Sequence, residues 1–389
     1  MNPIPYGKQW ICEDDVKCVK EALLSELITT GPKAREFEEA VAAYCGAKYA
    51  VAVSNGTAAL HLASLGLLEE GDKVLTTPNS FLATSNTILY AKASPIFVDI
   101  QENGNIDLDL CENELEKDPS IKAIYAVHFS GNPVEQEKLA RLKERFGVKI
   151  LEDCAHSIGA QYKSIKAGSC ANSDASIFSF HPVKHMTTGE GGMVTTNDKN
   201  LYEKVLLLRN HGMTKTDLTD KSMAYDSKGN KNPWYYEMHE LGYNYRITDI
   251  QCALGLSQLR KLDRFIERRR ELAKRYDEAF ENHHLVQPLY RYNTYSSYHL
   301  YVVLVDFDRL SITKAELFNK MVQKKIGLQL HYIPINKQPY YRTLGYGNES
   351  LPKMDNYYKK ALSLPLYPKM TDEEHRYVIE NFLEILTKG

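Results

Sequence analysis

The chain has 389 residues, which is enough for two domains of ordinary size. Hydrophobic residues make up 43% and charged residues 25%, a balance typical of globular proteins that excludes the disordered and fibrous classes. The formal net charge of -2 leaves no basic surplus, so the composition does not favour nucleic acid or an anionic membrane as a partner.

The N-terminus lacks a basic segment followed by an apolar run, so we expect no signal peptide. No stretch approaches the ~18 uninterrupted apolar residues of a membrane-spanning helix. The seven cysteines are scattered and form no C-x-x-C pair. Reduced thiols in a cytoplasmic protein are therefore the expectation.

Short apolar runs alternate with helical patterns through the first half of the chain. Strands are expected over 49–53, 73–76, 95–98, 123–127, 149–151, 175–180 and 192–196, and helices over 57–68, 82–91 and 135–146. Short β-branched strands separated by helices predict an α/β fold with a mainly parallel, seven-stranded sheet covered by helices. We expect this large domain to comprise residues 1–250.

The pattern changes near residue 250. Residues 250–275 are expected to form one long helix, followed by a strand candidate at 298–306, a helix at 314–325 and an extended segment at 327–332. These elements predict a smaller α+β domain over residues 251–389. Residues 213–236 are polar and contain Gly229 and Pro233, which indicates a long surface loop.

The first motif with chemical meaning is Ser-Asn-Gly-Thr at 54–57, between a strand and a helix. Gly56 lets the backbone approach a ligand closely, and Thr57 adds a hydroxyl. The helix that follows presents free N–H groups and the positive end of its dipole, as a phosphate site requires. The same residues also suit an ordinary capped turn, and no G-x-G-x-x-G or P-loop pattern accompanies them.

The second motif is Glu-Asp-Cys-Ala-His at 152–156, directly after an apolar strand. A carboxylate at the carboxyl end of a parallel strand faces the ligand-binding edge of the sheet. Opposite a pyridine nitrogen, Asp153 would keep that nitrogen protonated, which is central to pyridoxal-phosphate chemistry. An acidic helix cap is the alternative. Cys154 and His156 could suggest a metal, but no second cluster has ligand spacing, so we expect none.

The third motif is SIFSFHPVKHMTTGEGG, from residue 176 to residue 192. A lysine beside Pro182 and Val183 should be partly desolvated, which lowers the pKa of its amine and makes Lys184 nucleophilic. The hydroxyl of Ser179 suits a phosphate oxygen. The glycines that follow allow backbone conformations that other residues resist.

The three motifs, in this order, resemble those of the fold-type I pyridoxal-phosphate enzymes, in the branch of nucleotide-sugar aminotransferases. The resemblance covers essentially the whole chain. Its matching stretches are TTGPKAREFEEA, SNGTAALHLA, TTPNSFLAT, EDCAHSIGA, SIFSFHPVKHMTTGEGGMVTTND, RNHGM, LGYNYRITDIQCALGLSQL, HYIPINKQPYY and ALSLPLYPKMTDEE.

The resemblance implies a role for each residue that matches the family pattern. Lys184 matches the lysine that binds the cofactor covalently and moves protons, and Asp153 matches the partner of the pyridine nitrogen. The other cofactor-binding positions are Gly56, Thr57 and Ser179 at the phosphate, Phe81 and His156 beside the ring, and Asn244, which would reach the phosphate from a neighbouring subunit. Candidate substrate contacts are Glu26 and His331.

Within the family, the resemblance is strongest to C4-aminotransferases of pseudaminic acid biosynthesis. It implies pyridoxal 5'-phosphate as cofactor, a UDP-4-keto-6-deoxy-N-acetylhexosamine as substrate, L-glutamate as donor and a homodimer with shared active sites. Amination at C3 or C4 of another nucleotide-linked keto sugar stays open, because His185 stands where relatives often have proline and the 213–236 loop is longer. Dehydration is disfavoured because related dehydratases replace the lysine by histidine. A non-catalytic regulator would often lack the lysine or the aspartate.

Overall fold

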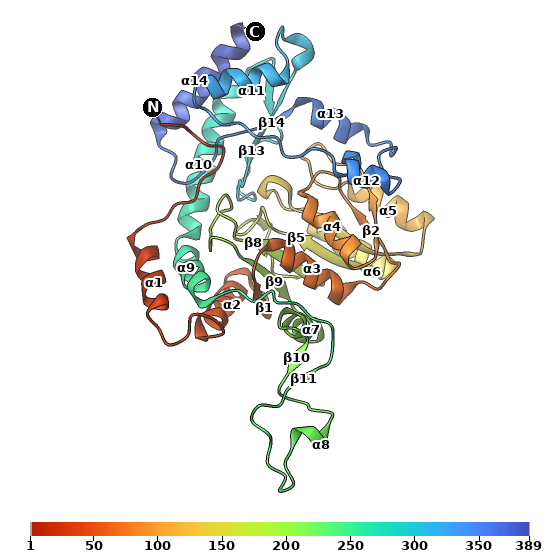
Figure 1. Cartoon of the computed structure of the whole chain (residues 1–389). Coiled ribbons are helices and arrows are strands. Elements are labelled where there is room, and N and C mark those ends of the chain that lie inside the picture. Colours follow the sequence, from red (N-terminus) through yellow and green to blue (C-terminus); the bar gives the residue numbers. More distant parts are fainter. Residues whose placement is uncertain (1, 389) are drawn as a thin grey trace.

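The computed structural model describes residues 2–388 and is built around a seven-stranded sheet (Figure 1). The strand order is β1-β9-β8-β5-β4-β2-β3. Only β9 runs opposite to the other six strands, so the sheet is mainly parallel and the expected fold class is confirmed. The strands are β1 (Tyr49–Val53), β2 (Lys73–Thr76), β3 (Ser94–Phe97), β4 (Ile121–Val127), β5 (Lys149–Asp153), β8 (Ala175–Ser179) and β9 (Gly192–Thr196).

Helices cover both faces of the sheet because its strands are apolar on both sides. On one face, Val51, Tyr125 and Ile177 pack with residues of α3 (Gly56–Leu67), α4 (Leu82–Tyr90) and α7 (Lys199–Arg209). On the opposite face, Ala52 and Phe178 pack with α2 (Pro32–Cys45) and α9 (Asp249–Leu259). Towards the β2 end, that face packs against α5 (Leu108–Lys117) and α6 (Gln136–Phe146).

The C-terminal part has its own antiparallel sheet and core. β12 (Val286–Pro288), β13 (Tyr301–Val305) and β14 (Ala361–Leu364) pair in that order. The core also draws on α10 (Leu262–Phe280), α11 (Lys314–Gln323) and α14 (Asp372–Lys388), and it includes Ile4 from the N-terminus. We propose that this core is the smaller domain, with residue 250 as the approximate boundary.

One detail of the sequence-based prediction is wrong: residues 250–275 do not form a single helix. The chain breaks between α9 and α10, where the Lys261 N–H donates to the Gln258 carbonyl, three residues back. This tighter bond interrupts the helical ladder. The break separates α9, which packs on the large sheet, from α10, which enters the C-terminal core.

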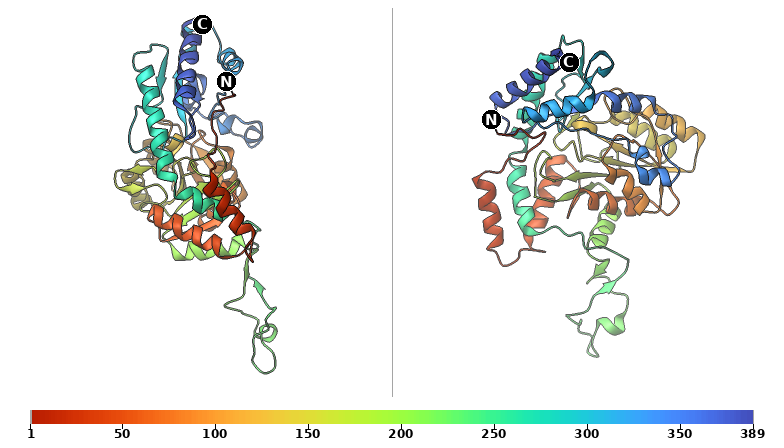
Figure 2. Two further views of the ribbon diagram at one scale, coloured as in Figure 1. Left: turned by 90° about the vertical axis from the view of Figure 1, so that its left-hand side faces the viewer. Right: turned by 45° about the horizontal axis from the view of Figure 1, so that its top comes forward.

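Residues 213–238 form an arm that extends away from the body (Figures 1 and 2). Two short strands, β10 (Met213–Thr214) and β11 (Glu237–Met238), pair at its base, and α8 (Lys221–Ala224) lies further out. The carboxylate of Glu237 fastens the arm by accepting hydrogen bonds from the backbone N–H groups of Thr219 and Asp220. The expected surface loop is therefore a segment with its own hydrogen bonds.

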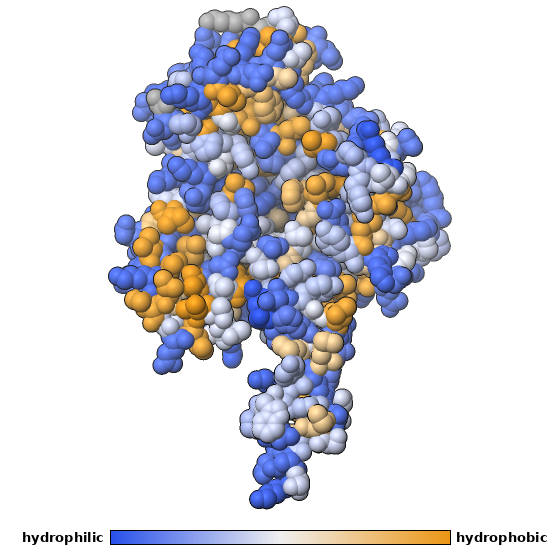
Figure 3. All heavy atoms as spheres, in the orientation of Figure 1, coloured by the Kyte–Doolittle hydropathy of each residue, from blue (hydrophilic) through white to orange (hydrophobic). Residues whose placement is uncertain are grey.

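The remaining elements are α1 (Glu13–Leu23), the hairpin of β6 (Gln161–Tyr162) and β7 (Ile165–Lys166), α12 (Pro339–Thr343), α13 (Pro352–Lys360) and three 3-10 turns, Phe129–Gly131, Phe307–Arg309 and Ile335–Lys337. Apolar side chains gather on the surface over α1 (Figure 3). Among residues 2–388, no helix has the length and apolar character needed to cross a membrane.

Candidate active site

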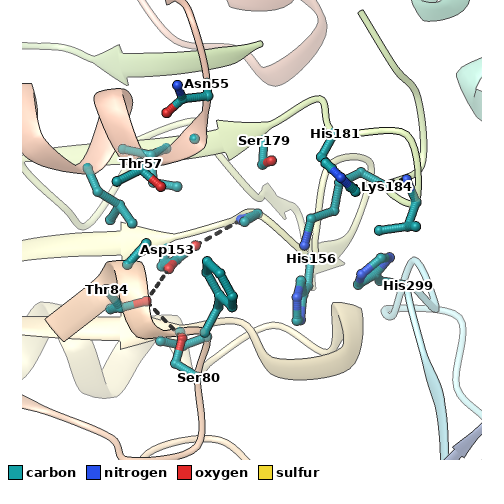
Figure 4. A pocket seen from close by; sticks show the side chains of 18 of the residues that line it. Asn55, Thr57, Ser80, Thr84, Asp153, His156, Ser179, His181, Lys184 and His299 are labelled. Carbon is teal, nitrogen blue, oxygen red and sulfur yellow. Dashed lines mark hydrogen bonds between the residues drawn. The ribbon is translucent and has the colours of Figure 1, made fainter. Parts of the chain in front are cut away.

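A cavity of about 930 Å³ opens where the parallel strands end, between the large sheet and the C-terminal part. Its wall contains eight of the predicted site residues: Gly56, Thr57, Phe81, Asp153, His156, Ser179, Lys184 and His331. Figure 4 shows several of them facing one another from β5, β8 and the start of α3. Ligands of α/β proteins bind at this edge of the sheet.

The first turn of α3 offers backbone N–H groups to the cavity. Asn55 caps the helix, because its Oδ1 accepts a hydrogen bond of 2.8 Å from the Ala58 N–H. The N–H groups of Gly56 and Thr57 have no acceptor within the helix. A Cβ on Gly56 would lie 2.8 Å from the Cβ of Ser179, so glycine allows the turn to approach β8. This arrangement fits a phosphate group.

Asp153 ends β5 and is almost fully buried. Its Oδ2 accepts a hydrogen bond of 2.7 Å from the Thr84 hydroxyl, and its Oδ1 accepts one of 3.1 Å from the Ala155 N–H. The Thr84 hydroxyl lies 2.8 Å from that of Ser80. The carboxylate is thus held in one orientation at the cavity wall, as a partner for a protonated pyridine nitrogen must be.

Lys184 lies on the loop after β8, with its amine in the cavity (Figure 4). Burial lowers the pKa of this amine from 10.5 to about 8, Asp153 opposes the shift, and Arg269 adds to it. Among residues 2–388, the amine takes part in no hydrogen bond. A neutral, unengaged amine is the form that attacks a carbonyl group.

A buried cation lies behind the lysine. Arg269 has no exposed surface, and its Nη1 donates to the backbone carbonyls of Tyr298, His299 and Leu366. Among residues 2–388, no carboxylate forms an ion pair with it. Burial lowers the pKa of Arg269 to about 9. An uncompensated positive charge in a region of low dielectric disfavours a second one, which is why Arg269 helps to lower the pKa of Lys184.

Histidines form a second layer beside Lys184. The ring of His299 lies 4.3 Å from that of His156 and 5.6 Å from that of His185, measured between centroids. Burial, followed by the nearby Lys184, lowers the pKa of His156 and of His299 well below the ordinary value. These rings are therefore neutral at physiological pH, and each has one donor and one acceptor nitrogen.

Sequence reasoning missed several residues of this wall, among them His299 and Tyr332. Both come from the C-terminal part of the chain, where no local pattern separated them from structural residues. Tyr332 belongs to the matching stretch HYIPINKQPYY, which was the only available signal. Its neighbour His331 does line the cavity. The His331 Nδ1 lies 2.9 Å from the Ser363 hydroxyl, and burial, followed by Lys184, lowers its pKa to about 3.

Two predicted residues lie outside the cavity wall. Asn244 is exposed, and its backbone pairs with Asn210. Glu26 is exposed in the segment between α1 and α2. Their expected roles at a ligand stay predictions. Among residues 2–388, no group of three or more histidine, cysteine or acidic side chains could hold a metal ion.

The fold and the cavity together define a pyridoxal-phosphate-dependent enzyme: the amides of α3 suit the phosphate, Asp153 suits the pyridine nitrogen, and Lys184 offers a free amine. More narrowly, residues 9–383 match the DegT/DnrJ/EryC1/StrS aminotransferase family, and the chain belongs to this family. It is therefore an aminotransferase that uses pyridoxal 5'-phosphate.

Individual relatives span the whole chain. The chain is 40% identical over 388 residues to the UDP-4-amino-4,6-dideoxy-N-acetyl-beta-L-altrosamine transaminase of Campylobacter jejuni, covering 99% of this chain and 98% of the relative. Its structure is similar to that of Helicobacter pylori PseC, an aminotransferase of pseudoaminic acid biosynthesis, with a TM-score of 0.91, 31% identity and full coverage of both chains. The PLP-form of the sugar aminotransferase Spr1654 from Streptococcus pneumoniae matches with a TM-score of 0.86 and 28% identity over 99% of each chain.

Proposed function

We propose that the enzyme transfers the amino group of L-glutamate to C4 of a UDP-4-keto-6-deoxy-N-acetylhexosamine. The product would be UDP-4-amino-4,6-dideoxy-N-acetyl-β-L-altrosamine, an intermediate of pseudaminic acid and surface glycan biosynthesis. The observation that carries the reaction type is the free amine of Lys184, with its lowered pKa, in the same cavity as Asp153. The similarity to the Campylobacter and Helicobacter proteins supports the choice of sugar.

The bound pyridoxal phosphate would supply an electron sink for the carbon that loses a proton, and it would store the amino group between the two half-reactions. Lys184 would take the proton from Cα of glutamate and later deliver a proton to C4 of the sugar. Asp153 would keep the pyridine nitrogen protonated, and the amides of Gly56 and Thr57, with the Ser179 hydroxyl, would hold the phosphate.

We further propose that the enzyme works in the cytoplasm as a homodimer with shared active sites. Apolar side chains of α1 and the following segment are exposed, among them Val16, Leu24 and Leu27, and such surfaces are typical of interfaces. No arginine of residues 2–388 lines the cavity, although the cofactor and UDP both carry phosphates. A second copy that placed Asn244 at the cavity would add a donor. All seven cysteines are unpaired, which suits a reducing compartment.

A mixing experiment tests the shared site. Lys184→Ala and Asn244→Ala proteins should each be inactive or weakly active, and mixing them should restore activity as hybrid dimers form with one intact site. Light scattering should give twice the mass of the 44.4 kDa chain. A monomer, or a mixture no more active than its components, would contradict the proposal.

The reaction itself divides into two measurable halves. The purified yellow protein should lose its visible colour when L-glutamate is added alone, and Lys184→Ala should show neither the colour nor the change. The bleached enzyme should regain colour with a UDP-4-keto-6-deoxy-N-acetylhexosamine, and NMR should show the new amine at C4. Amination at C3, or recovery with a different keto sugar only, would replace the proposed substrate. Colour that is indifferent to any donor would indicate a regulator.

A further inference from the structure

A chain of hydrogen bonds crosses the cavity wall from Ser130 through His156 to Tyr332. The Ser130 N–H donates to the His156 Nδ1 over 3.4 Å, and the His156 Nε2 lies 3.0 Å from the Tyr332 hydroxyl. A backbone N–H can only donate, so Nδ1 carries no proton. A neutral imidazole then holds its proton on Nε2, and the His156 Nε2–H donates to the Tyr332 oxygen.

This direction of the hydrogen bond leaves the proton of the Tyr332 hydroxyl free. Among residues 2–388, Tyr332 has no second hydrogen-bond partner. The phenol also stays protonated, because burial and the nearby Asp153 raise its pKa well above the ordinary value. A hydroxyl on the cavity wall whose oxygen is already engaged has its proton available for a ligand that enters the site.

The position of Tyr332 indicates which ligand groups could accept this proton. Its ring lines the cavity, 6.4 Å from the ring of Phe81 and 6.0 Å from that of His156, measured between centroids. These are the two rings that flank the expected place of the cofactor. Tyr332 therefore borders the space in which the cofactor ring and the reacting carbonyl group are expected to meet.

We propose that Tyr332 is a further catalytic residue, whose hydroxyl donates a hydrogen bond to a ligand oxygen that bears negative charge, and that His156 is the positioning residue that orients it. The inference rests on the proposed aminotransferase function. Two ligand oxygens share this chemistry: the phenolic oxygen of the cofactor ring and the carbonyl oxygen of the keto sugar. A hydrogen bond to such an oxygen changes a rate by roughly 10- to 100-fold.

Tyr332→Phe in the cofactor-loaded enzyme separates these two oxygens. If the partner is the cofactor oxygen, the visible spectrum without substrate and its pH titration should shift, and both half-reactions should slow. If the partner is the sugar oxygen, the spectrum and the glutamate half-reaction should stay unchanged, and only the return of colour with keto sugar should slow. Tyr341→Phe is the matched control, because its hydroxyl donates to Asn86 within the same core and outside the cavity.

The positioning role of His156 has its own test. His156→Gln keeps an N–H donor and should retain most of the effect of Tyr332, whereas His156→Leu should reduce the same spectrum or rate that Tyr332→Phe reduces. In the double variant Tyr332→Phe/His156→Leu, the losses at that step should not add, as expected for residues that act in one chain. Cofactor content and melting temperature identify any variant that fails to fold.

A Tyr332→Phe enzyme whose spectrum and both half-reaction rates lie within about twofold of those of Tyr341→Phe would overturn the inference. Additive losses in the double variant would overturn the positioning role of His156. A wild-type protein that never turns yellow with added cofactor would instead refute the proposed function, and the inference with it. The wild-type measurement thus separates the two failures.

Discussion

Replacing Lys184 by methionine should stabilise the cofactor-free protein near neutral pH. The pKa of this amine is lowered from 10.5 to about 8 in the folded state, whereas the unfolded chain gives lysine its ordinary value. Each tenfold change in proton affinity corresponds to about 1.4 kcal/mol, so the charged amine costs the folded protein roughly 3 kcal/mol. Lys184 is partly open to the cavity and water screens some of this cost. We therefore expect a gain of about 1–3 kcal/mol.

The pH dependence identifies the cause. Because the folded-state pKa of Lys184 lies below the unfolded one, the unfolded chain binds more protons between pH 8 and 10.5. Wild-type stability should therefore rise through this window relative to the variant. The full difference should be present below about pH 8 and disappear towards pH 10.5.

Urea unfolding of the colourless, cofactor-free proteins at pH 7 and pH 10 measures this difference. The exposed Lys369 provides a control, and Lys369→Met should change stability by less than about 0.5 kcal/mol at either pH. A Lys184→Met protein that is less stable than the wild type at pH 7 would refute the reasoning. So would a stability difference that stays constant as the pH rises.

Three further predictions concern the same cavity and its support. Because the neutral amine of Lys184 is the form that reacts, the rate at which the cofactor-free protein captures the cofactor should rise about fivefold or more from pH 7 to pH 9 and then level off. Visible absorbance followed at each pH measures this rate. Gly56→Ala should weaken cofactor binding by about 5- to 150-fold in a titration, since its Cβ would meet that of Ser179 at 2.8 Å, whereas Gly327→Ala, with a nearest contact of 3.4 Å, should not. Burial raises the pKa of Glu152, but hydrogen bonds from His128 and other side chains outweigh burial and lower this pKa to about 2. Thermal unfolding of the wild type should therefore show stability lost as the pH falls from about 4.5, and Glu152→Gln should show a shallower loss.

Much of the fold could be predicted because its signals are local. The strands expected at 49–53, 73–76 and 192–196 have the observed bounds of β1, β2 and β9. Apolar, β-branched runs between turn residues specify such strands without reference to the rest of the chain. Strand order is different: β9 lies between β1 and β8 and antiparallel to both, and no local pattern contains that information. The break at Lys261 was missed for the same reason, because α10 starts in the core that α9 joins and continues into the C-terminal core, which no local pattern reveals.

The site residues divide in the same way, into those that local signals mark and those that only the fold brings together. Gly56, Asp153 and Lys184 stand next to strand ends that the sequence reveals, so their convergence followed from the parallel sheet. Tyr332 and His156 are 176 positions apart, and their hydrogen bond exists only because the C-terminal part closes over the sheet. A tyrosine in an irregular segment has no periodicity to mark it. The hydrogen-bonding role of its hydroxyl can be recognised only once its partner in the fold is known.

The electrostatics of the cavity connect the stability of the empty protein to the reactivity of the site. Among residues 2–388, no carboxylate pairs with the buried Arg269, and its positive charge disfavours a second one on Lys184. Burial, followed by the charge of Lys184, lowers the pKa of His156 and of His299, so the neighbouring imidazoles stay neutral. The lowered pKa gives Lys184 a larger share of its nucleophilic neutral form, and neutral His156, whose Nδ1 accepts from the Ser130 N–H, donates from Nε2 to Tyr332. Burial and the charge of Arg269, which make a charged Lys184 costly in the empty protein, therefore also favour the nucleophilic form of Lys184, and bound anionic cofactor would relieve the cost.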